Sequence, residues 1–73
     1  MRLWELDVGE AARVAAVRGA GAMVLRLREL GLCEGETVSC VGVSPLGDPR
    51  AYRINGAVIA LRDADADAVE VQP

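Results

Sequence analysis

The sequence predicts a small, mainly β domain of residues 1–73 whose short strands curl into a partly open barrel. Three observations lead to this fold class. A chain of 73 residues has room for one compact core and little more. Glycine or proline recurs at short intervals, which limits the length of every element. Several segments alternate in polarity or carry β-branched residues, and about five such strands bury an apolar face best in a barrel.

The first expected strand covers residues 12–18, between Gly9 and Gly19. Val14 and Val17 within it are three residues apart, whereas a regular strand repeats its buried positions every second residue. This spacing predicts a β-bulge or a strong local twist inside the strand.

Residues 22–30 are expected to form the main helix. Three apolar residues recur there at helical spacing and predict the buried face. These residues are Met23, Leu27 and Leu30. Arg26 and Glu29 lie three residues apart on the more polar side, where they are placed to form an ion pair. Gly31 predicts a left-handed end of the helix, and Leu32 is placed to fold back onto it.

Residues 36–43 alternate in polarity and are rich in β-branched side chains, so they are expected to form a strand. Val38 and Cys40 share one face of this strand. The following segment, 44–49, contains two prolines around a Gly-Asp pair, which predicts a stiff loop.

A hairpin is expected from residues 50–54 and 57–62, because the Asn55-Gly56 pair between them tolerates the positive φ of a tight turn. Four apolar side chains of the two strands should face the same side of the sheet. They are Tyr52, Ile54, Ile59 and Leu61.

Residues 63–68 alternate aspartate and alanine, a pattern that fits either a strand or a helical turn. Repeated aspartate is unfavourable in strands, and Asp63 is a good N-cap, so a single helical turn is the preferred interpretation. Residues 69–72 then complete the sheet as a last strand.

Charge and composition argue against several classes of function. Eight arginines, no lysine and 11 acidic residues give a net charge of −3, whereas nucleic-acid binders carry a basic excess. The longest uncharged run, Thr37 to Gly47, has 11 residues, and a membrane-spanning helix needs about 20. Acidic residues near the N-terminus do not fit a secretory leader. We therefore expect a cytoplasmic protein that neither binds nucleic acid nor inserts into the membrane.

Catalytic and metal chemistry have few candidate residues. No histidine is present, which removes the commonest general base and the commonest metal ligand. Cys33 and Cys40 are weak metal candidates seven residues apart, and the preferred interpretation is a loop residue and a small buried side chain. No phosphate-binding loop is found either. We expect no catalytic residue, no resident metal and no cofactor.

Several motifs follow one another in a definite order along the chain. They are Leu3-x-x-Leu6-x-x-Gly9, Val14, Val17-x-Gly19, Arg26-Leu-x-Glu-Leu-Gly-Leu-x-x-Gly35, Val38-x-Cys40, Pro45-Leu-Gly-Asp-Pro49, Ile59-Ala-Leu-Arg62, Ala66 and Val69-x-Val71. Together they resemble the FeoA family of ferrous iron transport accessory proteins. The resemblance runs from about residue 3 to residue 71, and the ordered combination is more specific than any single motif. The sequence departs from the family pattern at Cys40, where an aliphatic residue is usual.

The resemblance implies an SH3-like barrel that acts beside FeoB, a membrane ferrous iron transporter with a cytoplasmic GTP-binding domain. It also leaves an alternative open. The same domain type occurs at the C-terminus of iron- or manganese-dependent repressors, so a metal-responsive regulatory module that binds a transition metal ion is the second interpretation. A third, a binder of proline-rich peptides, is disfavoured because Trp4 and Tyr52 are the only aromatic residues.

A contact surface is the remaining candidate site. The stiff loop presents Leu46 as an apolar anchor between Pro45 and Gly47, and Asp48 and Arg26 are candidates for charge complementarity with a partner. The opposing interpretation is that Gly47-Asp48 only makes the turn. An uncovered strand edge would also allow a homodimer.

Overall fold

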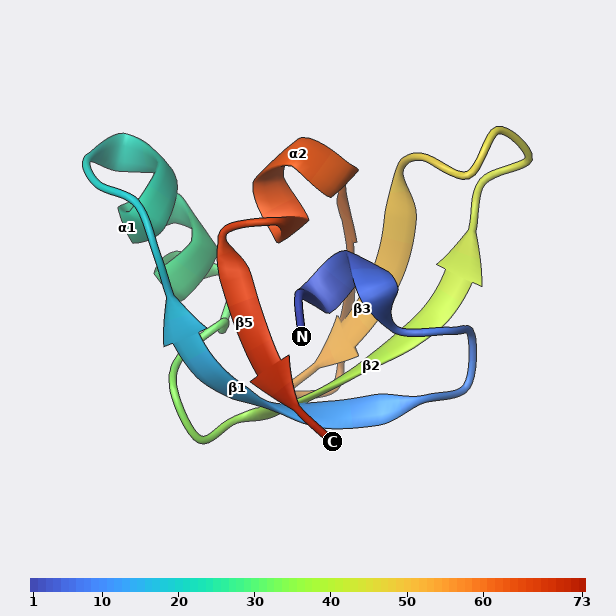
Figure 1. The fold of residues 1–73 in the computed structure, drawn as a ribbon, viewed down its shortest axis with the longest axis horizontal. Helices are drawn as coiled ribbons and strands as arrows, with labels where there is room; N and C mark the ends of the chain where they lie inside the picture. The colour runs from blue at the N-terminus through green and yellow to red at the C-terminus, as the bar shows by residue number, and fades with distance from the viewer.

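Five antiparallel strands form one curled sheet in the computed structural model, which describes residues 1–73 (Figure 1). The strands lie in the spatial order β4-β3-β2-β1-β5. The elements in chain order are η1 (Leu3–Glu5), β1 (Ala11–Val17), α1 (Ala22–Glu29), β2 (Thr37–Val43), β3 (Arg50–Ile54), β4 (Ala57–Leu61), α2 (Asp63–Ala66) and β5 (Val69–Gln72). All five predicted strands, the main helix and the helical turn are thus confirmed, each to within two residues at either end.

The predicted irregularity of the first strand is a shift in register between β1 and β5. Val14 pairs with Val71, but the next pair joins Ala16 to Glu70, so one residue of β1 has no partner. A bulge of this kind increases the local twist. The added twist helps the sheet to curl. β5 lies beside β1 at one edge of the curled sheet (Figure 1).

The 3-10 turn η1 was not predicted, because three residues carry no detectable periodicity. It follows the N-terminus, where Met1 exchanges two backbone hydrogen bonds with Val71, at 3.1 and 2.7 Å. Leu3 and Leu6 are both buried, so this segment fills the mouth of the curled sheet between β5 and β3 (Figure 1). Trp4 packs against the core and donates a hydrogen bond to Asp67 at 2.8 Å.

The end of α1 follows the sequence prediction closely. Gly31 has φ of +106°, a conformation that glycine adopts without steric cost. Its N–H bonds to the carbonyl of Arg28 at 3.0 Å, and the N–H of Leu32 bonds to the carbonyl of Leu27 at 3.1 Å. These two bonds form a Schellman motif. Leu27 and Leu32 are both buried in the core, so the chain does fold back onto the helix.

The predicted buried face of α1 is correct at Leu27 and wrong at Met23. Leu27 is 1% exposed, whereas Met23 is 37% exposed and Leu30 is half-buried. The helix contacts the sheet chiefly through its C-terminal half, because Leu32 and Gly31 hold that end against β3. The first turn therefore extends beyond the sheet.

The hairpin of β3 and β4 carries the largest buried side chain. Asn55 and Gly56 both have positive φ, at +50° and +79°, as the predicted tight turn requires. Tyr52 is fully buried, and its neighbours on the inner face complete a core of 14 residues. The core residues are Leu3, Leu6, Ala12, Val14, Leu27, Leu32, Val38, Cys40, Tyr52, Ile54, Leu61, Ala66, Val69 and Val71.

Neither α1 nor α2 has the length and apolarity needed to cross a membrane.

Candidate functional site

The loop between β2 and β3 presents the most exposed hydrophobic side chain of the molecule. Leu46, at the tip of this 44–49 loop, is 94% exposed. Backbone hydrogen bonds hold the loop closed behind it, from Gly47 N–H to the Ser44 carbonyl at 2.8 Å and from Ser44 N–H to the Pro49 carbonyl at 3.1 Å. The loop therefore holds an apolar side chain in solvent on a braced backbone.

The base of the loop is tied to α2 by side-chain contacts. The Asp48 carboxylate accepts a hydrogen bond from the backbone N–H of Asp63 at 2.9 Å. Asp63 in turn pairs with Arg50 at 3.5 Å, and Arg50 donates to the carbonyl of Leu6 at 3.3 Å. The prediction that Asp63 caps α2 is wrong, because Asp63 is the first helical residue and its N–H is satisfied by Asp48 from another part of the chain.

Four buried polar atoms of residues in or near this loop make no hydrogen bond: Ser44 Oγ, Arg50 Nε, Tyr52 Oη and Asp63 Oδ1. Arg50 Nε and Asp63 Oδ1 are the two atoms of the 3.5 Å ion pair. Burial raises the pKa of the Tyr52 hydroxyl well above its ordinary value of 10.0, and the nearby Cys40 thiol adds to the increase. Tyr52 therefore stays neutral at physiological pH.

Arg26 does not join the loop residues in one surface. It lies on α1, at the opposite end of the long axis from the 44–49 loop (Figure 1). The predicted pair with Glu29 is absent. Instead Arg28 pairs with Glu34 at 2.8 Å, because the chain turns back after Gly31 and brings Glu34 alongside the last turn of the helix. This hydrogen bond lowers the pKa of the Glu34 carboxyl and raises the pKa of Arg28.

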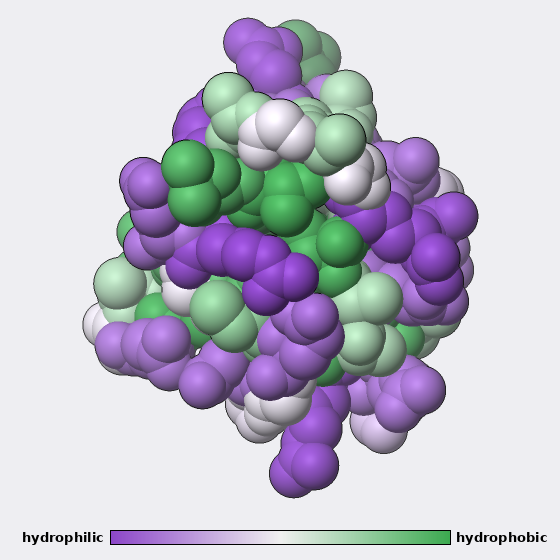
Figure 2. Space-filling model, turned by 90° about the vertical axis from the view of Figure 1, so that its left-hand side faces the viewer, coloured by the Kyte–Doolittle hydropathy of each residue, from purple (hydrophilic) through white to green (hydrophobic).

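The end of the molecule that carries α1 has its own apolar side chains. Leu25 is 60% exposed and Met23 is 37% exposed. Figure 2 faces this end and shows hydrophobic patches interrupted by hydrophilic side chains. The molecule therefore presents two separated apolar features, the tip of the 44–49 loop and the outer side of α1.

The two cysteines are not brought into a metal centre. Cys40 is fully buried on β2, and its Sγ lies 3.7 Å from the carbonyl of Gly42. Cys33 follows α1 and is partly exposed, with Sγ 3.8 Å from the carbonyl of Arg28. No group of three or more histidine, cysteine, aspartate or glutamate side chains is placed to hold a metal ion.

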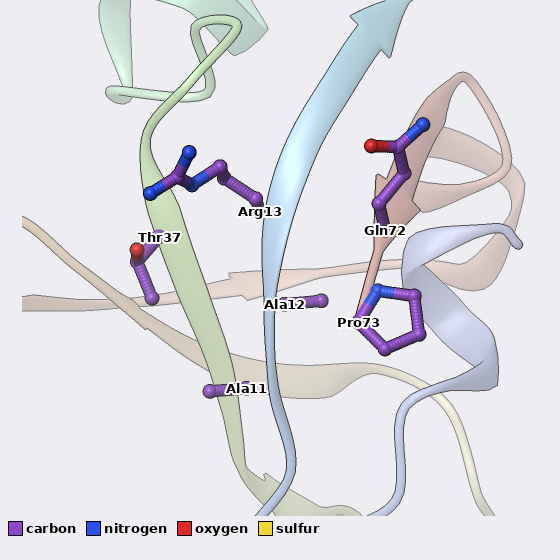
Figure 3. Close-up of a pocket in the computed structure, with 6 residues that line it drawn as sticks. All are labelled: Ala11, Ala12, Arg13, Thr37, Gln72 and Pro73. Carbon is purple, nitrogen blue, oxygen red and sulfur yellow. The ribbon is translucent and has the colours of Figure 1, made fainter.

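A shallow pocket of about 430 Å³ lies where β2, β1 and β5 run side by side (Figure 3). Arg13 extends from β1 over β2 toward Thr37, while Gln72 stands on β5. Sequence reasoning missed this pocket, because its lining joins residues from both ends of the chain. Its six lining residues are Ala11, Ala12, Arg13, Thr37, Gln72 and Pro73. Arg13 is the only charged side chain among them.

Comparison with known proteins assigns this architecture to a family. The FeoA domain matches the chain over residues 1–73. A protein of Porphyromonas gingivalis, described as a fusion of Fe(2+) transport protein A with the Fe(2+) transporter FeoB, is 40% identical over 72 residues. That match takes in 99% of this chain but only 8% of the fusion protein.

Solved structures agree with this assignment. Iron(II) transport protein A of Clostridium thermocellum is 36% identical with a TM-score of 0.95, covering 99% of this chain and 44% of that one. FeoA of Stenotrophomonas maltophilia in complex with zinc, described as a procaryotic SH3 domain protein, is 36% identical with a TM-score of 0.88, over 99% and 89% of the two chains. A manganese-dependent transcriptional repressor shares the fold, with a TM-score of 0.87 at 20% identity over 99% of this chain and 35% of the repressor.

The predicted SH3-like barrel is thereby confirmed, and so is the resemblance drawn from the motifs. The family match spans every element from η1 to β5, and the identity to the fused relative extends over nearly the whole chain. This chain belongs to the FeoA family.

Proposed function

We propose that this chain is a non-enzymatic accessory of a FeoB-type ferrous iron transporter, which docks on the transporter's cytoplasmic part and modulates Fe²⁺ uptake. The observation that carries the proposal is the fusion of a 40% identical relative to FeoB in one polypeptide. Fusion holds two domains at a high effective concentration, which is useful when the domains act together. The lack of any histidine agrees with a role that needs no proton transfer by the chain itself.

We place the docking surface on the 44–49 loop. Leu46 is almost fully exposed, and a leucine in solvent gains most when a partner covers it. The loop is held by backbone bonds and by the Asp48–Asp63 hydrogen bond, so little conformational entropy is lost when a partner binds. Pro45 and Gly47 flank the leucine and shape the tip. Arg26, at the far end, would contact only a partner large enough to span the molecule.

Docking modulates transport only through a difference in affinity. If FeoB alternates between two conformations, an accessory that binds one of them more tightly shifts the equilibrium toward that conformation. The shift is at most the difference between the two binding free energies. The proposed mechanism therefore requires unequal binding to the nucleotide states of the GTP-binding domain.

Isothermal titration of this chain with the cytoplasmic domain of the FeoB from the same organism tests the proposal. The domain is used nucleotide-free, with GDP and with a non-hydrolysable GTP analogue. We expect measurable binding that differs among the three states. Absence of binding in all three states would contradict the proposal, as would equal binding in all of them.

A pair of leucine variants locates the surface. Leu46→Ser should weaken binding about tenfold or more, as expected for an anchor residue that contributes at least 1.4 kcal/mol. Leu25→Ser is the matched control, because it removes an exposed leucine from the opposite end of the molecule. If Leu25→Ser weakens binding and Leu46→Ser does not, docking occurs on α1 and the loop assignment is wrong.

The second candidate is a metal-responsive regulatory module. The specific observation behind it is the likeness to the manganese-dependent repressor, which concerns the fold alone. Titration of the reduced protein with Fe²⁺ and Mn²⁺ separates the candidates. Micromolar or tighter binding, abolished in a Cys33→Ser variant, would favour the metal-responsive module over the transporter accessory.

A further inference from the structure

The two edge strands of the sheet, β5 and β4, differ in whether their outer backbone groups are paired. At the β5 edge, Met1 exchanges backbone hydrogen bonds with Val71, and Arg2 forms a β-bridge with Glu70. At the other edge, β4 pairs only with β3. An unpaired edge strand presents a row of backbone donors and acceptors to any extended chain. β4 is therefore the place where this sheet is open to another strand.

The register of the hairpin identifies the free backbone groups. A two-residue turn makes Ile54 and Ala57 a hydrogen-bonded pair, and such pairs alternate with non-bonded ones along an antiparallel ladder. Val58 and Ala60 stand in the non-bonded positions, opposite Arg53 and Ala51. Their N–H and C=O groups consequently point away from β3. Both residues are exposed, Val58 by 57%.

Natural edge strands are commonly protected by a charge, a proline or a bulge. β4 has the sequence Ala-Val-Ile-Ala-Leu, which contains no charged residue and no proline. Its pairing with β3 is continuous over five residues without a bulge. The strand itself thus lacks the usual features that prevent pairing.

Two arginines beside this edge are exposed and unpaired. Arg53 lies directly across from Val58, and Arg62 follows the end of β4 on the same face as Val58 and Ala60. Both arginines are exposed and neither takes part in an ion pair. The four ion pairs of the molecule use Arg2, Arg18, Arg28 and Arg50.

We propose that the β4 edge binds an extended acidic segment of a partner protein, which adds to the sheet as a further strand through Val58 and Ala60 while Arg53 and Arg62 pair with its carboxylates. Strand addition of this type takes affinity from backbone hydrogen bonds and specificity from side chains. A second copy of this chain is a poorer occupant, because pairing two β4 edges brings four arginines together and β4 itself carries no carboxylate. The inference does not depend on the partner being the transporter.

The test uses two acetylated and amidated hexapeptides, Glu-Val-Glu-Val-Glu-Val and Lys-Val-Lys-Val-Lys-Val, titrated into the ¹⁵N-labelled chain. The acidic peptide should slow hydrogen exchange at the amides of Val58 and Ala60, by about twofold at half occupancy because only the free half then exchanges. The lysine peptide should leave both rates unchanged. Added salt should weaken the acidic peptide's effect by screening.

Two variants separate the backbone and charge contributions. Ala60→Pro removes an N–H that points away from β3, so it should abolish binding and leave the ladder to β3 intact. The double variant Arg53→Glu with Arg62→Glu should reverse the preference between the two peptides, so that it binds the lysine peptide and not the acidic one. Arg13→Glu, at another exposed arginine without an ion pair, is the matched control and should bind as the unaltered chain does.

Three results would overturn the inference. The amides of Val58 and Ala60 could show no slowing, or both peptides could slow them equally. They could also be slowed by raising the protein concentration without peptide, which would identify a homodimer.

A parallel titration with the FeoB cytoplasmic domain keeps the two proposals apart. Binding that leaves the β4 amides unaffected would refute strand addition by FeoB but not docking. If the acidic peptide binds but the FeoB domain does not, the docking proposal fails and strand addition at β4 stands.

Discussion

The carboxylate of Asp48 accepts a hydrogen bond of 2.9 Å from the backbone N–H of Asp63, fifteen residues further along the chain. Asp63 opens α2, whose own N-cap, Arg62, supplies no side-chain acceptor. The loop that exposes Leu46 thus provides the acceptor that the helix lacks, and the helix holds the loop in place. One side-chain hydrogen bond therefore links the exposed loop to α2.

Replacing Asp48 with alanine should lower the free energy of unfolding by about 0.5–2 kcal/mol, the usual range for losing a side-chain acceptor at a helix start. Chemical denaturation measures the loss. Asp48→Asn keeps an acceptor oxygen and should retain most of the stability. Equal losses in the two variants would mean that the negative charge, rather than the hydrogen bond, is what matters.

Leu27→Ala should lower the free energy of unfolding by about 2–5 kcal/mol, because it removes a fully buried side chain on the face of α1 that packs against the core. Leu25→Ala is the matched control on the same helix, and at 60% exposure it should change stability by less than about 0.5 kcal/mol. Thermal and urea unfolding of both variants give the comparison. Similar losses for the two leucines would show that α1 is oriented differently.

Tyr52→Phe should leave the free energy of unfolding within about 0.5 kcal/mol of the original, or raise it, because the buried hydroxyl has no hydrogen-bond partner. A loss above about 1 kcal/mol, the worth of one hydrogen bond, would reveal that an ordered water satisfies the hydroxyl.

Alkaline pH should destabilise the chain through the same residue. The pKa of Tyr52 is raised in the folded state, so above the ordinary value of 10.0 the folded state holds a proton that the unfolded state releases. The contribution of the protonated Tyr52 to the free energy of unfolding is fully present below pH 10.0 and falls as the pH rises beyond that value. The chain has one tyrosine, so tyrosinate absorbance reports this group alone and should appear together with unfolding. Tyrosinate formation in the folded protein near pH 10.0 would contradict the assignment.

Acid should act through Glu70. A hydrogen bond from Arg18, followed by the charge of that guanidinium, lowers the pKa of the Glu70 carboxyl below its ordinary 4.5. The contribution of this pair is present above pH 4.5 and is lost as the pH falls through the lowered value. Arg18→Gln should raise the pKa of Glu70 toward 4.5, as followed by carboxyl ¹³C shifts. Arg13→Gln, on β1 and without an ion pair, should leave the pKa of Glu70 unchanged; a shift there would contradict the pairing.

Local features were predictable because they depend on residues close together in the sequence. The end of α1 needs only Gly31 and the hydrogen bonds of its immediate neighbours. The β3–β4 hairpin needs only the Asn55-Gly56 pair and the alternation on either side of it. Even the bulge in β1 was visible in the spacing of Val14 and Val17. For the helix end and the hairpin, neighbouring residues are enough to set the conformation, whereas the bulge is completed only by the pairing of β1 with β5.

The candidate site was predictable only in part. The sequence identified the 44–49 loop, since two prolines around Gly-Asp restrict the backbone whatever surrounds them. It could not place Arg26 far from that loop, and it paired Arg26 with Glu29 where the structure pairs Arg28 with Glu34. The direction of a side chain on a helix is periodic, but which partner it meets depends on how the following chain turns.

The sequence alone determined the order and type of the main elements, the family and the loop that carries Leu46, because these follow from short-range patterns of residues. Tertiary structure alone decided that Asp48 would meet Asp63, that Met23 would lie in solvent, and that Met1 would cover one edge of the sheet while β4 stayed open. Each of these depends on how the sheet curls and where the helices contact it, and that is settled by the packing of the whole core rather than by neighbouring residues.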